Sequence, residues 1–146
     1  MKKIYNLHEL SKIIENRKNN GNRIVMCHGV FDLLHEGHIE HFSYAKKKVN
    51  ILLVSITDDK YVNKGPNKPY NNSLKRAKVL SALKDIDFVY INKSPTSIPV
   101  LKSLKPKFYF KGKDYIQKDL TGNLKNEKKE LVKNNGKFIH TPTKMM

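Results

Sequence analysis

Two histidines three residues apart, His35 and His38, are the side chains of this sequence best suited to chemistry on phosphates. A neutral imidazole carries one N–H donor. Two such donors across one turn can both reach a polyphosphate chain while negative charge shifts to a leaving group. Transfer at phosphorus depends on positioning and charge stabilisation more than on a covalent nucleophile. The pair therefore predicts a polyphosphate site.

The sequence around the histidines predicts that they stand at the start of a helix. Residues 23–27 form a short apolar run typical of a buried strand, and residues 36–48 have helical periodicity. A helix N-terminus presents unpaired N–H groups and a positive dipole end, which favour phosphate, and Gly37 lets the backbone approach a ligand closely. The backbone expected to contact a nucleotide here comprises Gly29, Val30, Phe31 and Gly37.

Predicted strands and helices alternate along the rest of the chain. Further strands are expected at 50–57, 88–91, 108–110 and 137–140, and further helices at 7–18, from Ser73 as the cap, at 97–104 and at 123–133. The polar segment 58–72 is expected to be a loop over the site. This alternation predicts an α/β fold, a Rossmann-like open parallel sheet with helices on both faces and ligands at the carboxyl ends of its strands.

Length and composition predict one cytoplasmic domain. The 146 residues, 38% of them hydrophobic, suffice for one core, so residues 1–146 are expected to form a single domain in which residues 1–20 supply a lead-in helix. No apolar run approaches the roughly 18 residues of a membrane span, and the polar start does not match a signal peptide. The one cysteine, Cys27, is expected to be a small core thiol rather than a nucleophile.

The formal net charge of +16 raises the question of nucleic acid as a partner. The lysines are spread along the whole chain among many asparagines, and they do not alternate with aromatic residues as in a stacking platform for single strands. We therefore expect no nucleic-acid partner. A positive field would still help to recruit an anionic triphosphate.

Further motifs carry a resemblance to a known family. A basic loop, Lys64-Gly65-Pro66-Asn67-Lys68-Pro69, precedes Ser73-Leu74-Lys75-Arg76, and Lys111-Gly112-Lys113-Asp114-Tyr115 follows a predicted strand. Together with His35-Glu36-Gly37-His38, they resemble the cytidylyltransferase-like family of HxGH nucleotidyltransferases over nearly the whole chain after about Arg23. The KGxDY pattern is similar to the branch that makes nucleotide-activated heptose.

The resemblance implies transfer of a nucleotide from a nucleoside triphosphate, ATP or CTP, to a sugar phosphate such as heptose 1-phosphate, with release of pyrophosphate. It also implies assistance by Mg²⁺ and a homodimer. The implied catalytic residues are His35, His38, Lys64 and Arg76, and the implied nucleotide-binding residues include Lys111, Gly112 and Asp114. The alternatives are a glycerol-3-phosphate cytidylyltransferase and a nucleotide-binding module without catalysis.

Three other polar residues near the motif have two interpretations each. His28 either touches the nucleotide or satisfies a backbone carbonyl, and Asp32 either caps the turn or orients a signature histidine. His41 either completes a metal site with His35 and His38 or lies on the helix surface; we expect the surface position and no metal ligands in the protein.

The end of the chain departs from the family pattern. Relatives follow their last strand with a serine-threonine-threonine signature at the nucleotide site, whereas this sequence ends Thr141-Pro142-Thr143-Lys144-Met145-Met146. The expectation is either a longer natural protein or a copy that has lost part of the site.

Overall fold

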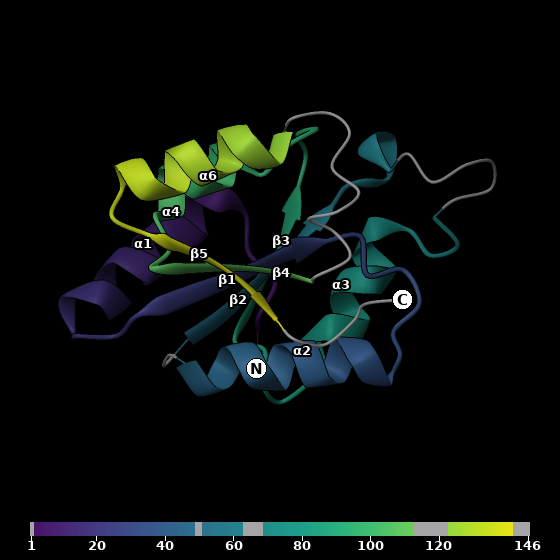
Figure 1. Cartoon of the computed structure of the whole chain (residues 1–146). Coiled ribbons are helices and arrows are strands. Elements are labelled where there is room, and N and C mark those ends of the chain that lie inside the picture. Colours follow the sequence, from purple (N-terminus) through teal and green to yellow (C-terminus); the bar gives the residue numbers. More distant parts are fainter. Residues whose placement is uncertain (1, 49–50, 63–68, 113–122, 142–146) are drawn as a thin grey trace.

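The protein folds around a five-stranded parallel sheet (Figure 1), seen in a computed structural model that describes residues 2–48, 51–62, 69–112 and 123–141. The strands are β1 (Ile24–Gly29), β2 (Ile51–Thr57), β3 (Phe88–Asn92), β4 (Phe108–Gly112) and β5 (Lys137–Thr141). The helices are α1 (Leu7–Asn19), α2 (Glu36–Lys48), η1 (Asp59–Tyr61), α3 (Ser73–Ser81), α4 (Ile98–Leu104) and α6 (Asn123–Lys133). The sheet order is β3-β2-β1-β4-β5.

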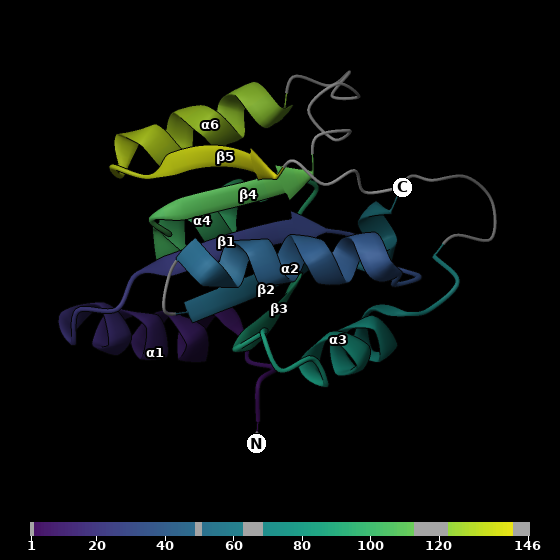
Figure 2. The same ribbon diagram turned by 60° about the horizontal axis from the view of Figure 1, so that its bottom comes forward.

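Helices cover both faces of this sheet (Figure 2), which confirms the predicted Rossmann-like α/β fold. Helices α2 and α3 pack on one face, where they meet alternate residues of β1 such as Val25 and Cys27. Helices α1, α4 and α6 pack on the other face against Ile24 and Met26. The Cys27 side chain is fully buried, and burial raises the pKa of its thiol, so the prediction of a core thiol is confirmed.

Asparagine side chains cap the N-termini of α1 and α3. Asn6 accepts the backbone N–H of Glu9 at 2.8 Å, and the Glu9 carboxylate accepts the N–H of Asn6, which together form a capping box for α1. Asn72 accepts the N–H of Lys75 at 2.9 Å and caps α3. The expectation that Ser73 is the cap was wrong by one residue, because Ser73 is already the first helical residue.

The strand order creates a switch point at the centre of the sheet. From β1 the chain proceeds to β2 and β3 on one side, and it later returns to place β4 and β5 on the other side. Open α/β sheets bind ligands at the carboxyl ends of the strands that flank such a point. Here those strands are β1 and β4, and the segment that follows β1 carries the two signature histidines.

In the ranges that the structure describes, no helix is long and apolar enough to cross a membrane.

Candidate active site

The two signature histidines lie side by side where α2 begins. Their ring centroids are 4.0 Å apart with an angle of 39° between the planes. The Nδ1 atom of His38 accepts the backbone N–H of His35 at 3.1 Å, and the Nδ1 atom of His35 accepts the backbone N–H of Gly37 at 3.0 Å. The backbone around the motif therefore holds both rings.

These two hydrogen bonds select the tautomer of each ring. A backbone N–H can only donate, so each Nδ1 must be an unprotonated acceptor. The single proton of the neutral imidazole is then on Nε2 in both His35 and His38. The motif thus supplies two Nε2–H donors from adjacent rings, the arrangement that the spacing of the histidines predicts for a polyphosphate site.

The start of α2 has a role that the sequence does not reveal. The N–H of Gly37, expected to lie close to a ligand, donates to the His35 ring. The N–H groups of His38 and Ile39 donate to the carbonyl of His35 at 3.0 and 3.2 Å. These N–H groups therefore serve to hold the motif together in this conformation.

The Phe31 ring packs against the His38 ring. The two rings meet edge to face at 5.6 Å between centroids, and the Phe31 ring also packs on Phe42 of α2. Phe31 has a φ of 51°, a region that bulky residues rarely adopt. A Cβ atom on Gly29 would lie 3.0 Å from the Phe31 ring, so the missing side chain at Gly29 makes room for it. The predicted nucleotide contacts of Gly29, Val30 and Phe31 remain predictions.

Asp32 fastens the site to the segment before α3. Its carboxylate accepts the backbone N–H groups of Tyr70 and Asn71 at 2.6 and 2.8 Å, and its carbonyl accepts the Asn71 side-chain amide at 3.2 Å. Of the two interpretations offered by the sequence, the structural role is the one seen, although the turn that Asp32 caps lies 38 residues away in the chain.

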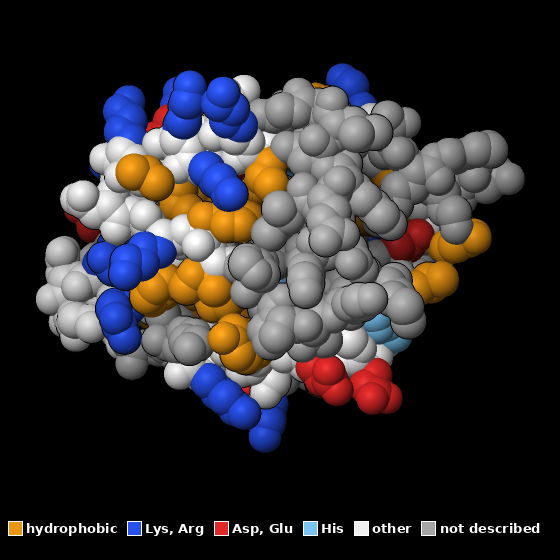
Figure 3. Space-filling view, viewed as in Figure 1, with side chains coloured by type: hydrophobic (Ala, Val, Ile, Leu, Met, Phe, Trp, Pro, Cys, Tyr) orange, Lys and Arg blue, Asp and Glu red, His pale blue; other side chains and the backbone are white. Residues whose placement is uncertain are grey.

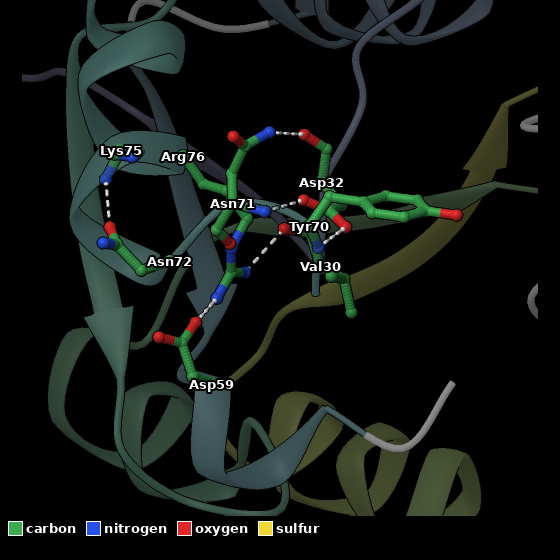
Figure 4. A network of polar contacts seen from close by, with 8 residues as sticks. All are labelled: Val30, Asp32, Asp59, Tyr70, Asn71, Asn72, Lys75 and Arg76. Atoms are coloured by element: carbon green, nitrogen blue, oxygen red, sulfur yellow. Dashed lines mark hydrogen bonds and ion pairs between the residues drawn. The ribbon is translucent and has the colours of Figure 1, made fainter. Parts of the chain in front are cut away.

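Arg76 is buried inside a polar network (Figure 4). Its side chain is 0% exposed and forms an ion pair with Asp59 at 2.6 Å. Its Nη1 donates to the carbonyl of Val30 at 2.8 Å, and its Nε donates to the carbonyl of Asn71 at 3.0 Å. Direct neutralisation of a triphosphate, as predicted from the resemblance, would need a different conformation of this side chain. The sequence does not single out Asp59.

His28 lies between two hydroxyl side chains of the neighbouring strand. Its Nδ1 is 2.9 Å from the Ser55 hydroxyl, and its Nε2 is 3.5 Å from the Thr57 hydroxyl. His28, Ser55 and Thr57 follow the alternation of Met26 and Leu53, so they belong to the face covered by α1, α4 and α6.

His41 is buried, which corrects the expectation of a surface position. The side chain is 1% exposed, and burial, with a smaller effect from His38, lowers the pKa of His41 to about 4. The sequence is misleading here because the polar neighbours of His41 indicate a solvated helix face. Within the described ranges, no group of three histidine, cysteine or acidic residues is placed to hold a metal ion.

The remaining predicted site residues divide between β4 and parts outside the described residues. Lys111 and Gly112 end β4, beside the carboxyl end of β1, where the switch point lies. Lys64 and Asp114 lie outside the described residues, as does Thr143, while Thr141 is the last residue of β5.

Figure 3 shows where the charged side chains of the described residues lie on one face of the molecule. Lysine and arginine side chains gather over α6 and its neighbours, whereas acidic and histidine side chains lie near the first half of α2. The four exposed lysines of α6 are Lys125, Lys128, Lys129 and Lys133. Among the described residues on this face, lysine and arginine thus gather over α6 and not over the first half of α2.

The sheet and the paired histidines define a class of protein: a Rossmann-like domain with an HxGH signature at the helix after its first strand. Within that class, the chain belongs to the cytidylyltransferase-like family, whose model matches residues 26–144.

Relatives in this family include several proteins called bifunctional protein HldE. The protein from Campylobacter fetus is 38% identical over 123 residues, which cover 83% of this chain and 26% of the relative. The protein from Geotalea uraniireducens is 35% identical over 143 residues, covering 97% of this chain and 28% of the relative. This chain thus spans about a quarter of the length of the curated relatives it matches.

Solved structures share the fold. A lipopolysaccharide core biosynthesis protein from Thermoplasma volcanium superimposes with a TM-score of 0.71 at 23% identity, covering 86% of this chain and all of the other. A pantoate-beta-alanine ligase from Francisella tularensis, complexed with beta-gamma ATP and beta-alanine, gives a TM-score of 0.69 at 20% identity over the whole of this chain and 69% of the other.

Proposed function

We propose that this chain transfers a nucleotidyl group from a nucleoside triphosphate to a phosphorylated small molecule and releases pyrophosphate. The observation that carries the proposal is the pair of histidines whose tautomers are set by backbone N–H groups. Both rings offer Nε2–H donors beside the switch point of the sheet. Family membership and the HldE relatives support the same chemistry.

In the proposed reaction, a phosphate oxygen of the acceptor attacks the α-phosphorus while the bond to the β-phosphate bridging oxygen breaks. His35 and His38 donate hydrogen bonds to phosphate oxygens as charge moves to the leaving pyrophosphate. Fixed donors need no reorganisation during the reaction, which is why they stabilise a transition state better than water does. Neither ring needs to accept or lose a proton for this role.

The triphosphate is proposed to enter as its Mg²⁺ complex. Mg²⁺ commonly retains water and binds through substrate phosphates with one or two protein carboxylates. The cation would supply charge neutralisation on the phosphates. Lys64, outside the described residues, and Lys111 are the further cations proposed for the triphosphate.

The acceptor proposed first is a sugar phosphate such as heptose 1-phosphate. It is supported by the KGxDY pattern at Lys111 and by the names of the relatives. His28, Ser55 and Thr57 place an imidazole and two hydroxyls near the carboxyl ends of β1 and β2, where a sugar could find polar partners. Glycerol 3-phosphate with CTP is the main rival pair.

The test is pyrophosphate release from each of ATP and CTP with each of heptose 1-phosphate and glycerol 3-phosphate. Turnover with heptose 1-phosphate alone supports the proposed acceptor, and the preferred triphosphate identifies the base. Turnover only of CTP with glycerol 3-phosphate would overturn the choice of acceptor. Triphosphate binding without turnover, unchanged by His35→Ala or His38→Ala, would show a binding module without catalysis.

A homodimer is proposed on the family resemblance, and sedimentation equilibrium tests it. Leu33 and Tyr70 are large exposed apolar side chains. Their backbones are near each other, because Asp32, the residue before Leu33, accepts the backbone N–H of Tyr70. Apolar surface of this kind fits a contact between copies. A monomer at all accessible concentrations would contradict the dimer.

A further inference from the structure

The turn between β1 and the signature histidines holds an unfavourable backbone conformation. Phe31, at its centre, has a φ of 51°. For a bulky side chain this region is unfavourable, and it persists only where the surroundings determine it. The contacts on either side of Phe31 should therefore account for the conformation.

Both neighbours of Phe31 are held by α3 and the segment that leads into it. Ahead of Phe31, the carbonyl of Val30 accepts the Arg76 guanidinium at 2.8 Å. After it, the carboxylate of Asp32 accepts the backbone N–H groups of Tyr70 and Asn71. The turn is thus clamped on both sides by residues about 40 positions further along the chain (Figure 4).

One side chain, Arg76, joins three segments at this clamp. Its guanidinium reaches Val30 in the turn, Asn71 before α3 and Asp59 in η1 through three different nitrogens. A planar guanidinium has N–H donors in fixed directions, whereas a lysine ammonium is a compact charge on a flexible stem. Lysine can therefore retain the charge at this position, but not the three directed contacts.

The conformation of the turn determines whether the Phe31 ring packs against the His38 ring. The Phe31 ring contacts the His38 ring edge to face, and His38 is only 8% exposed. A side chain at Gly29 would crowd the Phe31 ring where it lies. If the turn relaxed, Phe31 would leave His38, and the Nδ1 contact of His38 with the backbone of His35 would lose its support.

We propose that Arg76 is a positioning residue, which holds the turn at residues 30–32 so that Phe31 keeps His38 in its Nε2–H tautomer. Arg76 acts through Val30 and Phe31 and does not touch the substrate. The kinetic part of this inference rests on the proposed function, but the tautomer of His38 can be measured without turnover.

The first measurement is the imidazole ¹⁵N spectrum of histidine-labelled protein, wild type against Arg76→Lys. The wild type is expected to show Nδ1 of His38 as an unprotonated nitrogen and Nε2 as a protonated one. In Arg76→Lys the two shifts should move toward the average of exchanging tautomers. The matched control is Lys46→Met, which removes another ion pair of 2.6 Å, with Asp87, remote from the turn; there the His38 shifts should stay unchanged.

The second measurement separates positioning from substrate contact by steady-state kinetics. Misplacement of a catalytic group lowers kcat by about tenfold or more, with a smaller change in the KM for the triphosphate. A raised KM with unchanged kcat and unchanged His38 shifts would overturn the proposal in favour of direct contact. If wild type shows no turnover, the proposed function fails, and the spectra still decide the role of Arg76.

Asp59→Asn provides a second variant if Arg76→Lys does not fold. Asp59 is 41% exposed, so water can replace its contact and folding should survive. Without the Asp59 carboxylate as partner of its Nη2, the Arg76 guanidinium should hold Val30 less firmly. The ¹⁵N shifts of His38 should then move in the same direction as expected for Arg76→Lys. His38 shifts identical to wild type in folded Asp59→Asn would count against the clamp.

Discussion

The two ends of the sheet each have an ion pair of the same length, placed in very different surroundings. At the amino end, Lys46 of α2 meets Asp87 ahead of β3 at 2.6 Å, with 29% and 34% of the two side chains exposed. At the carboxyl end, Arg76 meets Asp59 at 2.6 Å with no exposed surface on the arginine. The distance alone does not distinguish a pair that fastens two elements from one that is enclosed in a site.

Backbone conformation follows the same division. Among the described residues, Gly21, Lys105 and Asn135 have positive φ values in turns that lead from a helix into a strand, at the amino end of the sheet. Left-handed residues are routine at helix C-termini. Phe31 has its positive φ after strand β1, at the carboxyl end of the sheet, where its ring contacts the signature histidine His38. Unfavourable conformation and buried charge thus meet where the chemistry is proposed.

The largest expected effect at the carboxyl end is the loss of a donor to the phosphates. His38→Ala should lower kcat by about 10²–10³-fold, the range for removing one transition-state hydrogen-bond donor. The measurement is pyrophosphate release under saturating substrate. His8→Ala, on the exposed surface of α1, is the control and should leave kcat unchanged. A folded His38→Ala protein with near-normal kcat contradicts the assigned role.

A second large effect concerns pH and His41. The pKa of His41 is lowered to about 4 from an ordinary 6.5, so between these values the unfolded chain binds a proton at this residue that the folded protein does not. Stability from His41 is therefore complete above about pH 6.5 and falls as the pH drops toward 4, by roughly 3 kcal/mol in all.

Urea unfolding of wild type and His41→Gln at pH 7 and pH 4.5 measures this effect. The variant cannot take up the proton, so its free energy of unfolding should decrease less between the two pH values. Equal decreases in both proteins would show that His41 titrates normally in the folded state.

Removing the cation from each ion pair sharpens the comparison between the two ends. Arg76→Met leaves the Val30 and Asn71 carbonyls and Asp59 without their donor and should reduce the free energy of unfolding by about 3 kcal/mol, the lower end for a broken buried pair because Asp59 is partly exposed. Lys46→Met should reduce it by about 1 kcal/mol or less. Similar losses of unfolding free energy in the two variants would show that the two ion pairs contribute equally to stability.

The smallest effects are expected at the helix caps. Asn6→Ala and Asn72→Ala each remove one side-chain acceptor from a helix N-terminus and should each lower the free energy of unfolding by about 1 kcal/mol. Only Asn72→Ala should also lower kcat, because Asn72 adjoins the clamp at Asn71. Thermal melts and kinetics on both variants measure this, and a kcat loss in Asn6→Ala would weaken the assignment.

Hydrophobic patterning predicts most of the fold because the buried strands are short apolar runs and the helices show helical periodicity. The helix predicted at 36–48 matches α2, and strands were extended or shortened by only a few residues, as for β1, predicted at 23–27 and observed at Ile24–Gly29. Motif position likewise predicts the pair His35 and His38. The cap of α3 is harder to predict from the sequence, because Asn72 and Ser73 are both good N-cap residues and only the hydrogen bond to Lys75 distinguishes them.

The supporting contacts of the site were beyond prediction from the sequence. Arg76, Asp59 and Val30 are brought together by tertiary packing of segments that no local pattern relates. The burial of His41 depends on which face of α2 meets the sheet, and its polar neighbours obscure that face. Ser97, Tyr109 and Glu127 form a buried cluster in which the Glu127 carboxylate accepts hydrogen bonds from the backbone N–H and the hydroxyl of Ser97. No local pattern in the sequence relates these three residues either.

The burial of Cys27 makes the chain its own reporter of unfolding. It is the one cysteine of the sequence, it lies in the central strand, and its thiol is both enclosed and hard to ionise. Reaction with an alkylating reagent requires the thiolate and access to it. Labelling of the intact protein should therefore proceed only through molecules that have opened around β1, so mass spectrometry of one residue would follow the opening of the sheet in every variant above.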